Sequence, residues 1–272
     1  MDVQLITMML LVTLLGGVFG SFVSMLSYRL PRGEEIIWGR SSCPQCRASI
    51  SIKHLIPILS YIMIEGKCKQ CNKPISIRYL LIELASVVSG LMIYFAYGPS
   101  LHGIILFILT IIIITICVCD IEHYMIPDSV QISLALLAII YNFMQHQGMI
   151  PIFSYPIYTP IDMITGAMLG GGCGIVVRAI VMAWKKKDPL GMGDIKLMAV
   201  SGLFLGMQFL PIFAFLSGVI GIITGSIWRV TKKTDIFPFG PALGISLLIC
   251  LLYPKVNTLF LYFINKLIVG SN

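Results

Sequence analysis

The chain has 272 residues, of which 57% are hydrophobic and only 11% are charged. A soluble domain carries about 25% charged residues, so this composition excludes an ordinary soluble protein and indicates one embedded in membrane lipid. The net charge of +7 does not indicate nucleic acid as a partner, because nine of the 19 basic residues lie between Arg29 and Arg78 and most others cluster in two short segments.

The first apolar segment, residues 4–26, predicts a retained membrane helix rather than a cleaved signal peptide. No basic residue precedes the segment, whereas Arg29 and Arg32 follow it. This order is typical of a helix whose C-terminal end lies in the cytoplasm. We therefore expect residues 1–28 to form the first transmembrane helix.

Residues 29–78 form a polar insertion with two Cys-x-x-Cys motifs, Cys43-Pro44-Gln45-Cys46 and Cys68-Lys69-Gln70-Cys71. Four thiolates at this spacing are typical of a tetrahedral zinc site, and a cytoplasmic location keeps them reduced. Since a closed four-cysteine site has no open position for water or substrate, we predict a structural zinc in this domain. Disulfides or a redox dithiol are the alternative.

Residues 79–272 hold the remaining apolar segments and are expected to form one transmembrane domain. Together with the first helix they predict an all-α polytopic membrane protein of about eight transmembrane helices. The expected spans are 4–26, 79–97, 101–119, 129–147, 161–184, 196–210, 212–229 and 243–264, with a break near Pro211. The basic loops 29–78, 185–195 and 230–242 then share the cytoplasmic face with the loop 120–128.

Two aspartates fall at the cytoplasmic ends of these spans. Asp120 ends the apolar run 111–119, and Asp194 lies in Gly191-Met192-Gly193-Asp194, just before another apolar segment. A carboxylate at the membrane boundary is costly, so it marks a functional site. Because both aspartates lie on one face, they can pair although 74 positions separate them.

Such a pair has the chemistry of an aspartic protease. Two facing carboxyl groups cannot both ionise, so one holds a proton. The ionised group takes a proton from water, and the protonated group hydrogen-bonds the scissile carbonyl. The glycines at 191 and 193 would let an extended peptide approach closely. We predict Asp120 and Asp194 as the catalytic residues.

Simpler interpretations compete for the polar residues around this pair. Asp194 could instead cap the helix that follows it or pair with Lys196, and Asp128 reads as the start of a helix after Pro127. Glu122 and His123 read as solvated residues at the membrane interface.

Short motifs then follow one another along nearly the whole chain. They are Gly20-Ser21-Phe22, Tyr28-Arg29-Leu30-Pro31, Ser42-Cys43-Pro44-x-Cys46, Ile56-Pro57-Ile58-Leu59-Ser60-Tyr61, Gly66-Lys67-Cys68-x-x-Cys71, Arg78-Tyr79 with Glu83, Asp120 with Ile126-Pro127-Asp128, Gly191-Met192-Gly193-Asp194-Ile195-Lys196-Leu197 and Pro238-Phe239-Gly240-Pro241. In this order they resemble the type IV prepilin peptidase family, the leader peptidases and N-methyltransferases of bacterial type IV pilus and type II secretion systems.

The resemblance implies an activity that spacing alone could not show. The family cleaves the short basic leader of prepilins and pseudopilins after a Gly, on the cytoplasmic side of the inner membrane. It then methylates the new N-terminal residue with S-adenosylmethionine. The catalytic aspartates of the family correspond to Asp120 and Asp194, and its frequent second acid corresponds to Glu122.

The resemblance leaves the methyl-donor site without assigned residues. It places this activity with the N-terminal cytoplasmic domain, where Glu83 and the zinc region are candidates, and it leaves open whether the protein forms a homodimer. Glu34 and Glu35 are candidates for the basic leader by charge alone. The alternatives are another intramembrane aspartyl protease, and a proton-coupled transporter or scaffold with a zinc docking domain.

Overall fold

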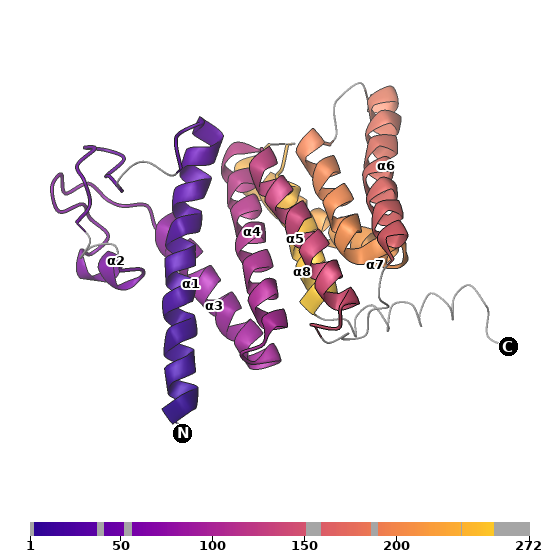
Figure 1. Cartoon of the computed structure of the whole chain (residues 1–272). Coiled ribbons are helices and arrows are strands. Elements are labelled where there is room, and N and C mark those ends of the chain that lie inside the picture. Colours follow the sequence, from indigo (N-terminus) through magenta and orange to yellow (C-terminus); the bar gives the residue numbers. More distant parts are fainter. Residues whose placement is uncertain are drawn as a thin grey trace. The chain divides into compact units, whose positions relative to one another are not determined.

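The computed structural model describes residues 3–36, 41–51, 56–150, 159–185, 190–234 and 236–252. Within these ranges the chain is all-helical apart from two isolated antiparallel bridges (Figure 1). It divides into two compact units, residues 1–115 and 116–272. Five of the described helices are long and apolar enough to cross a membrane, so the chain is a multi-span membrane protein.

The first unit is built on two helices that approach closely through glycine. Helices α1 (Val3–Arg29) and α3 (Arg78–Tyr97) pack against each other. A Cβ atom at Gly20 would lie 2.6 Å from the Cα of Glu83, so only glycine permits this approach. Small residues at such contacts are typical of helix pairs in lipid. In the sequence, η1 (Leu30–Arg32) and α2 (Leu59–Met63) come between these two helices.

The second unit holds the C-terminal end of α4 (Leu101–His123) and four further helices, which are α5 (Asp128–His146), α6 (Pro160–Lys185), α7 (Met192–Lys232) and α8 (Gly240–Leu252). Helix α7 is central, because it contacts α5, α6 and α8, and Figure 1 shows α6 alongside it. The contact between α6 and α7 brings Gly166 against the backbone of Gly202 and Gly206.

The break that we expected near Pro211 lies at Gly206 instead. Gly206 has φ 61° and ψ −177°, which interrupts α7 and separates residues 192–205 from residues 207–232. A positive φ costs glycine little, whereas other residues rarely adopt it. Pro211 lies inside the second half of α7. There it removes only a single helical N–H group.

The expected eight spans are not confirmed. Helix α7 covers two of them as one interrupted element, and α8 has 13 described residues, with the expected residues 253–264 lying outside the described ranges. Helix α5 buries Gln131, Asn142 and Gln145 and is not among the five candidate spans.

Candidate active site and metal centre

Asp120 lies in the last turn of α4, where its side chain is buried at 6% exposure. Its Oδ2 accepts a hydrogen bond of 2.7 Å from the backbone N–H of Gly240. Gly240 is the first residue of α8, so this carboxyl group lies at a helix N-terminus. Free backbone N–H groups and the helix dipole favour an anion at that position.

Asp194 lies in the first turn of α7. Gly191 is the N-cap of this helix, which makes Asp194 its third residue rather than the cap that we considered. The N–H of Gly191 interacts with the carboxyl group of Asp194, as the third residue does in a capping box. The other carboxyl oxygen, Oδ1, is buried without a hydrogen-bond partner in the described chain.

The two aspartates lie in the same compact unit, near the end of α4 and at the start of α7. The charge on Asp120 acts on the carboxyl group of Asp194, although they come from different helices. Each carboxyl group has one oxygen facing a backbone N–H at a helix N-terminus, and Asp194 has a second oxygen with no partner. A buried polar atom without a partner is costly. The arrangement therefore leaves one oxygen available to a proton, water or substrate.

The two glycines before Asp194, Gly191 and Gly193, lie against other residues of this protein. A Cβ at Gly193 would lie 3.3 Å from the Cβ of Ile126, and one at Gly191 would lie 3.2 Å from Oδ2 of Asp194. Gly193 thus permits the turn before α5 to approach the start of α7. These contacts give both glycines a packing role beside the aspartates, in addition to the substrate approach that the sequence predicts.

The neighbouring polar residues have separate partners. The Nζ atom of Lys196 lies 2.6 Å from Oδ1 of Asp128, so the expected alternative of a Lys196 pair with Asp194 is wrong. Asp128 is the first residue of α5, after the N-cap Pro127, as its sequence indicates. Glu122 is exposed and lies 3.9 Å from His123.

Gly240 is the site residue that sequence reasoning missed. The sequence Pro238-Phe239-Gly240-Pro241 indicates a break before the last helix, and the break is present. The available signal was a glycine beside a proline at a helix start. No pattern in the sequence indicates that its N–H group meets a carboxylate 120 positions away.

The four cysteines of the first unit form one cluster. The sulfur atoms of Cys43, Cys46, Cys68 and Cys71 all lie within 4.8 Å of one another. A tetrahedral zinc with sulfur ligands at about 2.3 Å separates the sulfurs by about 3.8 Å, so this donor set fits the metal with a small contraction. The backbone N–H groups of Cys71 and Gln70 lower the pKa of Cys68 to about 6, which favours the thiolate that zinc requires.

Each cysteine pair lies on a turn of the same design. In the first turn, the N–H of Cys43 bonds the carbonyl of Ala48, and the N–H of Arg47 bonds the carbonyl of Cys43. The second turn repeats both bonds with Cys68, Lys73 and Asn72. Matching turns of this kind present two sulfurs each toward one point, which is what a metal knuckle requires.

Glu83 ties the segment between the cysteine pairs to α3. Its Oε2 accepts a hydrogen bond of 2.7 Å from the backbone N–H of Ile58. Ile58 has φ 64°, an unfavourable value for a β-branched residue, so the bond to a buried carboxyl group holds it there. The described contacts of Glu83 are therefore those of an anchor for this segment.

Comparison with known proteins places the chain in a family. Residues 14–97 match the Bacterial Peptidase A24 N-terminal domain, and residues 107–226 match the Type IV leader peptidase family. The chain is 32% identical to a prepilin leader peptidase/N-methyltransferase of Neisseria gonorrhoeae, with 87% of each chain covered. The chain belongs to the type IV leader peptidase family.

Further relatives with the same name are similar to this chain over most of its length. The chain is 30% identical to the prepilin leader peptidase/N-methyltransferase of Bacillus subtilis, over 90% of this chain and 94% of the relative, and 29% identical to that of Vibrio cholerae. No solved structure matches the chain. Membership in the type IV leader peptidase family makes this protein a membrane peptidase and disfavours the transporter or scaffold alternative.

Proposed function

We propose that this protein cleaves the leader of type IV prepilins and pseudopilins and then N-methylates the new N-terminus. Family membership and the names of its relatives support this activity. The observation that carries the catalytic assignment is that the carboxyl groups of Asp120 and Asp194 each meet a backbone N–H at a helix N-terminus, and that the charge on Asp120 acts on Asp194. The cysteine cluster supports a structural zinc held by Cys43, Cys46, Cys68 and Cys71.

The proposed hydrolysis uses both aspartates and one water molecule. The ionised aspartate removes a proton from the water, whose oxygen attacks the scissile carbonyl carbon. The protonated aspartate donates a hydrogen bond to the carbonyl oxygen, and the resulting intermediate collapses when the leaving nitrogen receives a proton. The leader is released with a new carboxylate, and the mature chain is released with a free amine.

That free amine is the substrate of the second reaction. S-adenosylmethionine would supply the methyl group, and we assign no residue to its site. The basic segments that end α1 and α7 support a cytoplasmic position in the bacterial inner membrane for this face. Asp120 and Asp194 lie at ends of α4 and α7, and the same charge pattern supports a cytoplasmic position for both.

Cleavage of a co-expressed prepilin by Asp120→Asn and Asp194→Asn variants tests this proposal. Asparagine keeps the size of the side chain and removes its acid, so we expect leader cleavage to fall by at least about 1,000-fold in each variant. Mass spectrometry of the pilin reports both leader loss and a methyl increment. Normal processing by either variant would exclude the aspartate pair as the catalytic site.

A further inference from the structure

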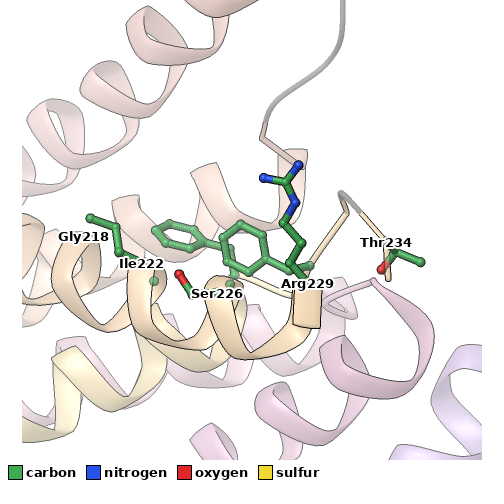
Figure 2. A pocket seen from close by; sticks show the side chains of 9 residues that line it. Gly218, Ile222, Ser226, Arg229 and Thr234 are labelled. Carbon is green, nitrogen blue, oxygen red and sulfur yellow. The ribbon is translucent and has the colours of Figure 1, made fainter. Parts of the chain in front are cut away.

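A cavity of about 410 Å³ lies along the second half of α7, beside the segment that joins α7 to α8. Figure 2 shows Gly218, Ile222, Ser226 and Arg229 on successive turns of α7, with Thr234 at one end and phenyl rings between them. Those rings belong to Phe237 and Phe239, while Asp120 and Asp194 are not among the lining residues. The cavity therefore does not contain the aspartates, but one of its walls is the segment that joins α7 to α8.

The two rings of this segment occupy gaps that glycines leave in α7. A Cβ at Gly221 would lie 2.6 Å from Cε2 of Phe239, and a Cβ at Gly225 would lie 3.3 Å from the ring of Phe237. The rings also meet edge to face, with centroids 6.1 Å apart. The position of Phe239 thus depends on the absence of a side chain at Gly221.

The position of Phe239 in turn determines where the adjoining backbone points. The peptide group between Phe239 and Gly240 is planar and rigid. Its carbonyl oxygen accepts the N–H of Leu243 at 3.2 Å, in the first turn of α8, and its N–H donates to Oδ2 of Asp120 at 2.7 Å. Both polar atoms of this peptide are therefore used, and one of them holds the carboxyl group.

The contact with Asp120 leaves no room for a side chain at Gly240. A Cβ at Gly240 would lie 2.8 Å from Oδ2 and 3.2 Å from Cγ of Asp120. Because the N–H group fixes Oδ2, the oxygen Oδ1 of Asp120 is the one left for water or for Asp194. A small shift of this peptide would therefore rotate the carboxyl group.

We propose that Gly221, Phe239 and Gly240 act as positioning residues that orient Asp120 for peptide hydrolysis. The inference rests on the proposed function of Asp120, and it assigns these three residues to alignment rather than to contact with substrate. A misplacement of about 1 Å at a reacting group can lower the rate about 100-fold, so the packing of one ring on α7 controls the reaction rate.

Substitution of two glycines of α7 tests the proposal. Gly221→Ala pushes against the ring of Phe239, whereas Gly218→Ala, in the same helix and lining the same cavity, meets nothing within 4 Å. We expect Gly221→Ala to lower kcat by about 10–100-fold with KM changed by less than about twofold. The Gly218→Ala control should retain the wild-type kcat and KM.

A second substitution provides a rescue. Phe239→Leu shortens the side chain, so the double variant Gly221→Ala with Phe239→Leu should recover part of the lost activity, at least about threefold in kcat over Gly221→Ala alone. Simple loss of stability would add the two effects instead of cancelling them. If Gly221→Ala does not accumulate as a folded protein, Phe239→Leu and Gly240→Ala carry the same test, and each should lower kcat without raising KM.

The outcomes separate this inference from the proposed function. Equal kinetics for Gly221→Ala and Gly218→Ala, or no recovery in the double variant, would overturn the positioning role while Asp120→Asn still abolishes cleavage. A raised KM in both glycine variants would make the cavity a substrate subsite and also overturn it. Full activity in Asp120→Asn would reject the proposed function itself, whatever the glycine variants do.

Discussion

At the scale of residues, Asp120 and Glu122 lie two positions apart in very different surroundings. Asp120 is buried and accepts a backbone N–H bond, whereas Glu122 is exposed beside His123. The side chain of Glu122 is 28% exposed, so its carboxyl group stays in contact with water, and a surface pair with histidine at 3.9 Å contributes little to stability. The local environment therefore favours Asp120 over Glu122 as the partner of Asp194.

This contrast gives a prediction for Glu122→Gln. Because the Glu122 side chain still reaches solvent and lies 3.9 Å from His123, we expect leader cleavage within about threefold of the wild-type rate and an unfolding free energy changed by less than about 1 kcal/mol. Initial rates of prepilin processing measure the first quantity, and thermal unfolding in detergent measures the second. A loss as large as that of Asp120→Asn would place Glu122 in the catalytic pair.

At the scale of elements, the contact between α6 and α7 depends on glycines that face backbone. A Cβ at Gly166 would lie 2.8 Å from the Cα of Gly206, the residue that interrupts α7. Backbone atoms cannot rotate away as a side chain can. The two helices must separate if any side chain larger than hydrogen is introduced there.

We therefore predict that Gly166→Ala lowers the unfolding free energy by about 1–3 kcal/mol. Gly172→Ala is the matched control, because it lies in the same helix and nothing is within 4 Å of its Cβ position. There alanine should be neutral or slightly stabilising, since it is the better helix former. Thermal unfolding of both variants in one detergent compares them, and equal stabilities would contradict the close contact.

Sequence patterns predicted where the helices lie in the chain better than they predicted which residues of different helices are in contact. Apolar length located the helices, and Pro127 with Asp128 indicated the start of α5. The interruption of α7 was expected at Pro211 and lies at Gly206, because proline is tolerated near a helix start whereas a positive φ favours glycine. The ion pair of Lys196 with Asp128 was missed, since it joins residues 68 positions apart.

At the scale of the whole molecule, the metal cluster and the aspartate pair belong to different compact units. A structural zinc stabilises the segment that holds its ligands. Hydrolysis by two aspartates needs no metal. Loss of zinc should therefore affect the two units differently.

We predict that Cys68→Ser removes bound zinc and leaves leader cleavage within about tenfold of wild type, whereas N-methylation is lost. Elemental analysis of the purified protein should give one zinc per wild-type chain and less than about 0.2 in the variant. Cys173→Ser is the control, because this exposed cysteine lies outside the cluster. Complete loss of cleavage together with zinc would show that the peptidase depends on the metal unit.

The sequence by itself indicated the membrane class, the four cysteines that cluster and the two aspartates proposed for catalysis, because apolar length, Cys-x-x-Cys spacing and acids at the ends of apolar runs are local properties. Only the tertiary structure decided which groups surround each aspartate. The N–H of Gly240 on Asp120, the ring of Phe239 at Gly221 and the effect of the Asp120 charge on Asp194 depend on distances between helices. Such distances follow from packing across the fold, where a missing Cβ or a rigid peptide acts on residues far away in the chain.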